Sequence, residues 1–373
     1  MLRIRDNLLT IIGKTLFPEY IYNPNLSFVL KDGLYLSLNH IKSLLGLLLL
    51  LVLESCANST KTEIYQKERD VITNVHSLVT EIQTDPVLIG SIARPCVLGN
   101  YVIIADFNSP DRLIHLFRKD NFKYLVSTAY AGQGPGEITR IGHIGTDENR
   151  HKFYVSDHGK QKIFSYDIDS VLSFPNYMPT VKIEMNAVQF PSEYQYVNDT
   201  LSFALAIEPT STSTFKQYIA KWNMQSGQFE RMKYQHPDIT KKRISFAVSI
   251  ENDIYIECYT FHDLMSICNL NGDLICNIYG PSWDSRESNR VHHYGDVIFC
   301  KDKILASYSG GANFSDEYNP TKILVFDLHG DYLKTLDVGY KIVDFCYDDD
   351  NNRIIMNLND EIQFAYLSLE GLI

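Results

Sequence analysis

The residue types best suited to chemistry are histidines that stand at predicted strand ends near carboxylates. Four histidines share this placement: His158, His262, His292 and His293. His292 and His293 are adjacent and lie close to Asp296, and a histidine pair beside a carboxylate could transfer protons or bind a metal. Neighbouring side chains on a strand point to opposite faces, however, so both would rarely reach one site. We treat the four as candidate catalytic residues, with ordinary structural histidines as the alternative.

The cysteines and the acidic residues do not indicate a metal site. Most of the six cysteines other than Cys56 lie in predicted strands beside apolar residues, where a free cysteine behaves as a small hydrophobic residue. No Cys-x-x-Cys pair occurs, although Cys268 and Cys276 flank one hairpin turn and could form a bridge. The acidic run at residues 348–352 lacks the spacing of a calcium loop and resembles residues 146–150, which favours a turn. We expect no metal and no cofactor.

Composition restricts the classes of partner. The chain has 373 residues, and its 34 Lys and Arg against 45 Asp and Glu give a net charge of −11. This charge argues against nucleic acid as a partner, because nucleic acid selects basic surfaces. The 24 Tyr and 19 Phe favour strands over helices.

The elements that must position these residues are strands in a recurring unit. Six segments read as a strand, a polar turn and a returning strand: residues 113–126, 162–174, 218–232, 264–278, 322–336 and 363–373. Four of the turns contain a glycine that can adopt positive φ: Gly227, Gly272, Gly330 and Gly371. Another pair of short strands precedes each hairpin. The first such pair lies at residues 96–107. About four strands in about 50 residues is typical of one propeller blade, so we predict an all-β, six-bladed β-propeller.

The last unit ends at Ile373 without a full outer strand. A closed propeller must pair its first and last blades or leave strand edges open. Residues 70–88 contain two short apolar segments, 71–72 and 79–82, that could supply the missing strand. We predict that this segment closes blade six. Residues 67–79 could instead form a short helix outside the ring, and the two interpretations are compatible.

The N-terminal part of the chain has the pattern of a targeting segment. Residues 44–53 form an apolar run preceded by Lys42, too short to span a membrane but suited to a signal-peptide core. The run ends in Leu53-Glu54-Ser55-Cys56, which resembles the lipobox of bacterial lipoproteins, although Glu54 is unusual there. The alternative is a core helix or strand. We expect lipidation at Cys56, with an N-terminal extension plus signal peptide at 1–55, a lipidated tether at 56–69 and the propeller at 70–373.

A Gly-rich stretch, Ala-Gly-Gln-Gly-Pro-Gly-Glu at residues 131–137, directly follows the first hairpin. With the aromatic-ended hairpins, it resembles the six-bladed TolB-like/NHL-like propellers found as lipoproteins in Gram-negative gut anaerobes. The resemblance implies the propeller fold and a cell-envelope location, and it implies no reaction. A phosphate-binding loop is disfavoured, because no Lys-Ser or Lys-Thr follows and Glu137 would repel phosphate.

Together these observations predict a cell-envelope lipoprotein, attached to the membrane through its lipid, whose propeller binds or scaffolds a glycan, peptide or protein. The Glu-Tyr-Gln-Tyr stretch at 193–196 could present two tyrosines on one face as a binding surface, or could simply pack in a sheet. The alternative function is a propeller hydrolase or lyase that uses histidines and carboxylates at the channel mouth. We favour binding over catalysis, because catalysis needs polar residues from several blades to converge on the axis.

Overall fold

The computed structural model describes residues 28–29, 35–36, 62–174 and 176–373. The predicted signal-peptide core and Cys56 lie outside the described residues. The chain divides into two compact units, Met1–Lys61 and Thr62–Ile373. Of the first unit, the structure describes only β1 (Phe28–Val29) and β2 (Tyr35–Leu36), which pair antiparallel. Among the described residues, no helix combines the length and the apolar character that crossing a membrane requires.

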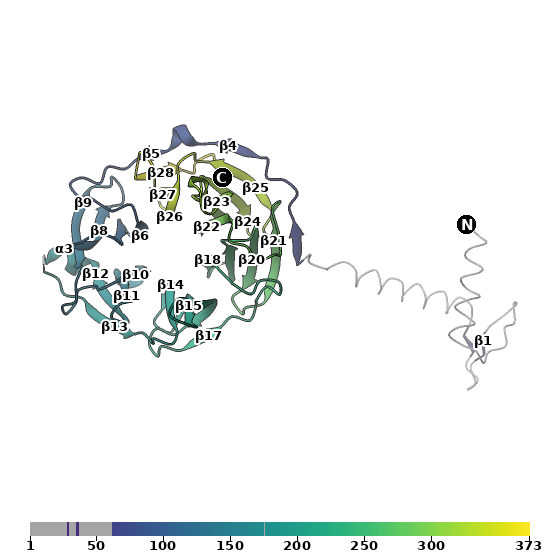
Figure 1. The fold of residues 1–373 in the computed structure, drawn as a ribbon, viewed down its shortest axis with the longest axis horizontal. Helices are drawn as coiled ribbons and strands as arrows, with labels where there is room; N and C mark the ends of the chain where they lie inside the picture. Colours follow the sequence, from purple (N-terminus) through teal and green to yellow (C-terminus); the bar gives the residue numbers. More distant parts are fainter. Residues whose placement is uncertain (1–27, 30–34, 37–61, 175) are drawn as a thin grey trace. The chain divides into compact units, whose positions relative to one another are not determined.

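The second unit is a ring of six antiparallel sheets, so the predicted six-bladed β-propeller is confirmed (Figure 1). Blade 1 contains β6 (Ala93–Leu98), β7 (Tyr101–Asp106), β8 (Arg112–Arg118) and β9 (Tyr124–Tyr130). Blade 2 contains β10 (Ile141–Asp147), β11 (Lys152–Asp157), β12 (Lys162–Asp167) and β13 (Thr180–Glu184). Blade 3 contains β14 (Phe190–Asn198), β15 (Leu201–Pro209), β16 (Phe215–Trp222) and β17 (Phe229–Arg231).

The other three blades follow in chain order around the ring. Blade 4 contains β18 (Ile244–Ser249), β19 (Ile254–Tyr259), β20 (Leu264–Asn269) and β21 (Leu274–Tyr279). Blade 5 contains β22 (Val291–Cys300), β23 (Lys303–Ala312), β24 (Lys322–Asp327) and β25 (Tyr332–Asp337). Blade 6 contains β26 (Ile342–Asp348), β27 (Arg353–Leu358) and β28 (Phe364–Ser368), and its outer strand comes from elsewhere. The first strand of each blade lines the centre of the ring, and apolar side chains of neighbouring blades pack together between them.

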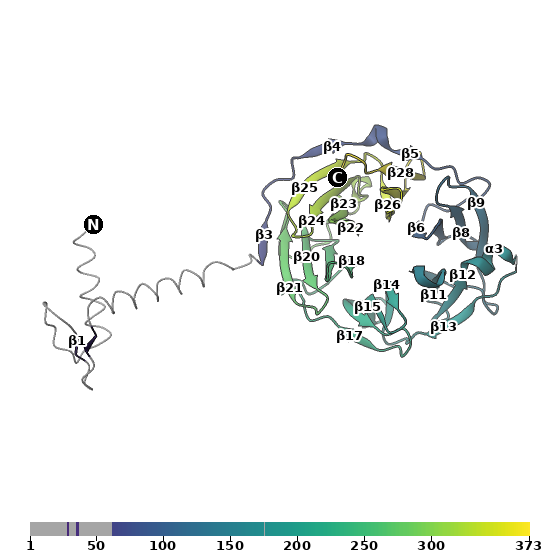
Figure 2. The same ribbon diagram turned by 180° about the vertical axis from the view of Figure 1, so that it is seen from behind.

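The outer strand of blade 6 is β5 (Thr80–Glu81), which pairs with β28, so the predicted closure by residues 70–88 is confirmed. The same N-terminal segment does more than the sequence predicted. Its β3 (Glu63–Tyr65) adds a fifth, parallel strand to β21, and its β4 (Ile72–Asn74) does the same to β25. We call residues 62–82 the strap, because they run along the outside of blades 4, 5 and 6 (Figures 1 and 2).

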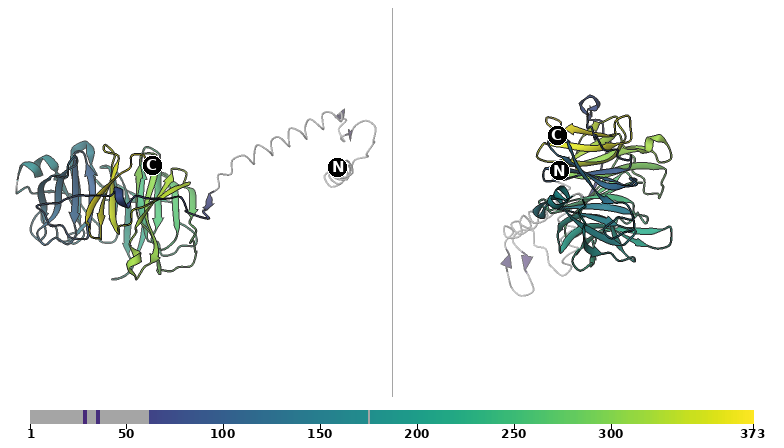
Figure 3. Two further views of the ribbon diagram at one scale, coloured as in Figure 1. Left: turned by 90° about the horizontal axis from the view of Figure 1, so that it is seen from above. Right: turned by 90° about the vertical axis from the view of Figure 1, so that its left-hand side faces the viewer.

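Viewed edge-on, the strap crosses the outer strands of these blades (Figure 3). The alternative of a short helix over residues 67–79 is not observed: this stretch contains β4 and, as its one helical turn, the 3₁₀ turn η1 (His76–Leu78). The predicted tether, residues 56–69, therefore overlaps the propeller from Thr62 onward.

One side chain fastens the strap to the ring. Arg69 is 7% exposed and donates to the carboxylate of Asp263, which is fully buried, at 2.9 Å. Arg69 also donates to the phenol of Tyr294 at 2.8 Å, and its guanidinium lies 5.1 Å from the ring centre of Tyr308. Asp263 is fixed in place, because it also accepts from the backbone N–H of Ser282 at 3.1 Å. The strap thus carries a buried ion pair into the junction of blades 4 and 5.

Blade 2 departs from the predicted hairpin at residues 162–174. After β12 the chain forms the helix α3 (Ile168–Ser173), and the returning strand begins only at Thr180. The physical reason lies in the cap: the Asp167 side chain accepts from the backbone N–H of Ser170 at 2.9 Å, and Asp169 occupies the first turn. An aspartate at this position satisfies a helix N-terminus, which outweighs the weak strand pattern that follows it.

The turns predicted elsewhere are present. Gly227, Gly272 and Gly330 have φ between 77° and 87°, as tight hairpin turns require. Gly371 has φ of 70° in the turn after β28, where no returning strand follows in the described residues. The acidic run follows β26 as a turn, with η2 (Glu148–Arg150) at the corresponding point of blade 2 and η3 (Asp316–Tyr318) in the β23–β24 connection. The six cysteines of the described region, Cys268 and Cys276 among them, are free thiols.

Candidate functional site

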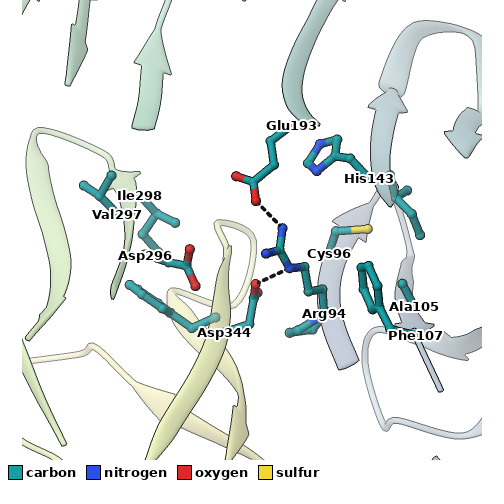
Figure 4. Close-up of a pocket in the computed structure, with 13 residues that line it drawn as sticks. Arg94, Cys96, Ala105, Phe107, His143, Glu193, Asp296, Val297, Ile298 and Asp344 are labelled. Atoms are coloured by element: carbon teal, nitrogen blue, oxygen red, sulfur yellow. Dashed lines mark hydrogen bonds and ion pairs between the residues drawn. The ribbon is translucent and has the colours of Figure 1, made fainter. Parts of the chain in front are cut away.

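The ionisable side chains that meet in the ring come from five of the six inner strands. They are Arg94 on β6, His143 on β10, Glu193 on β14, Asp296 on β22 and Asp344 on β26. They line a pocket of about 150 Å³ in the centre of the propeller, which we call the channel site (Figure 4). Cys96 and Phe107 contribute an apolar side to the same pocket. Polar residues from several blades therefore converge on the axis, an arrangement that catalysis requires and that can also bind a polar ligand.

Irregular strand pairing places four of these five residues. The register shifts between Ile141 and Ile144 on β10, which brackets His143, and between Pro191 and Glu193 on β14. It shifts again between Tyr294 and Val297 on β22 and between Ile342 and Asp344 on β26. A bulge bends its strand and redirects a side chain, and bulges are frequent beside functional sites. The same device is thus repeated in four blades at one level of the channel.

Arg94 is the hub of the channel site. Its Nη1 donates to Glu193 Oε1 at 2.6 Å, and its Nε lies 3.3 Å from Asp344 Oδ2. The guanidinium carbon lies 5.6 Å from the ring centre of Phe107. The Arg94 side chain keeps 41% of its exposure, against 13% for Asp344, so solvent reaches the arginine while the carboxylate lies deeper. Arg94 therefore holds Glu193 and Asp344 in place and leaves Asp296 out.

Asp296 has no ion-pairing partner in the part of the chain that the structure describes; only its backbone carbonyl accepts, from Ser307. Burial raises the pKa of Asp296 to about 6, although Arg94 acts in the opposite direction. Burial and the nearby charge of Asp296 together raise the pKa of Asp344 well above its ordinary value. Two carboxyl groups that repel each other in this way hold a proton between them at a pH where free aspartates are ionised.

The surroundings of Glu193 and His143 determine the charge states of these two groups. Burial is the largest influence on Glu193 and opposes its ionisation, but the charge and the hydrogen bond of Arg94, together with the neighbouring histidines, outweigh it, so the Glu193 pKa is lowered. Burial lowers the pKa of His143 to about 4, and its Nε2 lies 2.7 Å from the carbonyl oxygen of Tyr194. His143 is therefore neutral at physiological pH. The channel site presents three carboxyl groups against one guanidinium, an excess of negative charge that a cationic group can neutralise.

The four histidines predicted from the sequence do not line the channel site. His293 is buried, its Nδ1 lies 3.4 Å from the phenol of Tyr308, and burial lowers its pKa to about 4. His262 is buried and its Nδ1 lies 3.1 Å from the carbonyl of Asp284. Both belong to the surroundings of the Arg69–Asp263 pair, which is a packed junction.

The other two histidines are also separate from the channel site. His292 contacts the carbonyl of Tyr318 through Nδ1, so it and His293 have different partners although they are adjacent. His158 packs beside Phe190 with 5.4 Å between ring centres, and burial lowers its pKa. His262, His292 and His293 thus have hydrogen-bonding neighbours, whereas the buried Nε2 of His158 has no partner in the described residues, and a catalytic role of the four stays a prediction. In the described residues, no group of three or more His, Cys, Asp or Glu is arranged to hold a metal ion.

The tyrosines of the Glu-Tyr-Gln-Tyr stretch pack in the sheet. Tyr194 is buried against Trp222, and Tyr196 packs against the same cluster. It is the alternate residue, Glu193, that faces the channel.

The channel site is not apparent from the predicted strand segments, because the first of them, residues 96–107, starts two residues after Arg94. A charge within an alternating apolar pattern reads as the edge of a loop, yet on an inner strand it can face the channel. A signal was present: a charged residue or histidine stands near the start of the first strand in five of the six units.

Comparison with known proteins agrees with this architecture. A candidate exported protein of Bacteroides fragilis has a similar structure, with a TM-score of 0.51 and 11% identity over 82% of this chain and 98% of that one. A member of the DUF4221 family from Bacteroides vulgatus gives a TM-score of 0.52 and 9% identity over 78% of this chain and 95% of that one. At such identities the likeness concerns the fold alone. No curated protein matches the sequence.

The family model described as a 6-bladed beta-propeller, DUF5128, matches residues 56–291. This range includes four complete blades, the strap and three of the five channel-site residues. The chain belongs to this family of six-bladed β-propellers.

Proposed function

We propose that the protein is a cell-envelope binding module whose channel site receives a basic group, such as the lysine or arginine side chain of a peptide. The observation that carries this proposal is the carboxylate of Asp296, which faces the channel without an ion pair in the described region while Arg94 holds Glu193 and Asp344. A peptide cation would occupy the position that Arg94 cannot fill. The apolar side, with Phe107 and Cys96, would contact the aliphatic stem of such a side chain.

A cationic ligand is favoured over an anionic one by charge. Two unit charges 4 Å apart interact by about 4 kcal/mol at the intermediate dielectric constant of partly buried sites. An incoming cation gains this attraction and relieves the repulsion between Asp296 and Asp344, whereas an anion would add to it. A neutral glycan would leave the repulsion unchanged, so binding of glycans at this site is the weaker alternative.

The test is a calorimetric titration of the full chain with the blocked tripeptides Ala-Lys-Ala and Ala-Glu-Ala. We expect binding of the lysine peptide only, weakened by about tenfold in Asp296→Asn, which corresponds to about 1.4 kcal/mol. Affinity should also fall as the pH is lowered from 7 to 5, because Asp296 with a pKa of about 6 takes up a proton and loses its charge. The matched control is Asp302→Asn, the same change at an exposed carboxylate outside the pocket. Equal binding of both peptides, or equal effects of the two variants, would contradict the proposal.

A second candidate function, a hydrolase or lyase, is favoured by one observation. The raised pKa values of Asp296 and Asp344 keep a carboxylic acid available as a proton donor near neutral pH. Mass spectrometry of the peptide recovered after the titration separates the two functions. A binding module returns the lysine peptide intact, while an enzyme of this class returns fragments.

We further propose that the chain is a lipoprotein of the TolB-like/NHL-like kind found in Gram-negative bacteria, anchored through Cys56. Three observations support this location. They are the apolar run at 44–53, the lipobox-like residues before Cys56, and the structural similarity to the Bacteroides fragilis protein described as exported. In a Gram-negative host, the wild type should lose residues 1–55, gain the mass of a lipid and sediment with membranes. Cys56→Ala should remain without lipid. A wild type of full mass in the soluble fraction would refute the anchor and leave the channel-site proposal standing.

A further inference from the structure

A second pocket lies between blades 1 and 2, apart from the channel site and with no residue in common with it. Its volume is about 270 Å³, the space of about nine water molecules. The walls come from the end of β9, from the Gly-rich stretch at 131–137, from β12 and from the segment after α3. Tyrosines and prolines dominate them: Tyr130, Tyr166, Tyr177, Pro135 and Pro179. We call this the interblade pocket.

The phenol of Tyr166 is the unexplained group of this pocket. The Tyr166 ring is fully buried and stacks on Phe153, with 5.0 Å between ring centres, yet its hydroxyl has no hydrogen-bond partner in the described structure. Buried polar groups are nearly always paired, so an unpaired one that lines a pocket indicates a missing partner. Burial raises the pKa of this phenol far above neutrality, so the hydroxyl remains a donor and calls for an acceptor.

The other two phenols of the pocket already have partners. Tyr130 accepts from Arg112, whose guanidinium lies over the Tyr130 ring at 3.4 Å from its centre. Tyr177 accepts from the backbone N–H of Asp167 at 3.3 Å. Both bonds use the phenol oxygen as an acceptor, so Tyr130 and Tyr177 keep an O–H hydrogen to donate. The pocket thus combines aromatic walls with phenol donors, and Tyr166 is the phenol whose oxygen has no partner at all in the described structure.

The Gly-rich stretch forms one wall and is held rigid. The Glu137 side chain folds back to accept from the backbone N–H of Gly134 at 2.6 Å, so its charge is used within the loop. Lys160 donates to the carbonyls of Gly134 and Glu137, both at 2.7 Å. Gly136 has a φ of 76°, and a Cβ there would come within 2.7 Å of Met178, so the glycine keeps the wall open. The stretch first noticed in the sequence thus shapes a pocket, besides joining two blades.

We propose that the interblade pocket binds a proline-containing peptide segment, with Tyr166 donating a hydrogen bond to a peptide carbonyl. Polyproline II segments leave their backbone carbonyls without internal hydrogen bonds, and they dock in grooves lined by aromatic side chains. A prolyl ring matches the apolar walls, and a carbonyl beside it matches the free phenol. The ligand is uncharged at this point, because the one carboxylate of the pocket is engaged by Gly134.

A sugar is the disfavoured occupant. A saccharide ring carries several hydroxyl groups, and each one buried without a partner opposes binding. The side chains of the pocket offer mainly phenol O–H donors and the exposed amide of Asn176, while the carboxylate of Glu137 is engaged by Gly134, so the hydroxyl groups of such a ring would find few side-chain acceptors.

The test compares two variants that make the same change in the same kind of environment. Tyr166→Phe removes the free phenol of the pocket. Tyr255→Phe removes another fully buried phenol without a partner in the described structure, which lines neither pocket. The full chain and both variants are titrated with blocked hexaproline, with blocked hexaglycine and chitotetraose as comparison ligands. Circular dichroism and thermal unfolding check that both variants fold.

We expect hexaproline to bind the wild type and Tyr255→Phe equally, and to bind Tyr166→Phe about 5- to 10-fold more weakly, as for one hydrogen bond lost. Asp296→Asn should leave this affinity unchanged, so the two sites can fail independently. Wild-type affinity in Tyr166→Phe would overturn the proposal by showing that the phenol bonds only a trapped water. Absence of hexaproline binding, or a preference for chitotetraose, would overturn it as well.

Discussion

Replacing Arg69 by methionine is expected to lower the free energy of unfolding by about 3–5 kcal/mol, measured by urea denaturation. The methionine keeps the length of the apolar stem but leaves the fully buried carboxylate of Asp263 without its cation. Breaking a buried pair from one side is costly, because the remaining charge stays out of water. Asp263 cannot turn away, since a Cβ on Gly280 would already lie 2.2 Å from its carboxylate and Ser282 donates to it.

The control for this variant is Arg118→Met, which breaks the ion pair of Arg118 with Asp120 on the surface. Exposed pairs contribute little, so we expect Arg118→Met to unfold at nearly the same urea concentration as the wild type. The double variant Arg69→Met/Asp263→Asn should recover part of the loss, because it removes the unpaired charge. If Arg69→Met and Arg118→Met destabilise equally, the buried pair does not fasten the strap.

Removing the strap should have the second large effect. A chain that begins at residue 62 keeps the complete second unit and should unfold like the full chain. A chain that begins at residue 83 lacks Arg69 and all three strap strands, and it exposes the edges of β21, β25 and β28. We expect it to lose at least the 3–5 kcal/mol of the buried pair and to self-associate, because open strand edges pair with other chains.

Size-exclusion chromatography with light scattering and urea denaturation measure both outcomes of the truncation. Adding a synthetic peptide of residues 62–82 should restore the monomer, since all contacts of the strap with the ring are non-covalent. They comprise the pairing of β3, β4 and β5, the Arg69 contacts, the buried side chain of Val75, and His76 beside Val338 and Tyr340. A stable monomer without the strap would show that the strap is dispensable for closure.

The sequence predicted the parts of this fold that local chemistry determines. Strand alternation and the glycine turns gave the six blades, and the incomplete last unit gave the closure by Thr80 and Glu81. The parallel pairing of β3 and β4 with the outer strands was not predicted, because pairing between distant segments leaves no local pattern in the sequence. Helix α3 was not predicted for a different reason: the cap at Asp167 overrides an ambiguous apolar pattern.

The candidate site was less predictable than the fold. Histidines attracted attention through their side-chain chemistry, but His262 and His293 serve the packed junction of blades 4 and 5. Arg94 and Asp344 are 250 positions apart in the sequence and meet only because the ring brings β6 beside β26. Which charge faces the channel also depends on the bulges, and a bulge shifts the alternation that sequence reasoning assumes.

The order of contacts along the strap has a mechanical consequence. Tension applied to the chain before Thr62 would load the three-residue pairing of β3 first, then the Arg69–Asp263 pair, then β4, and the closing strand β5 last. The strand that closes the ring is thus the most shielded from a pull at its own N-terminal side. The strap's contacts with blades 4 and 5 would therefore break one after another before the force reaches blade 6. These outer contacts could be lost while β5 still closes the ring.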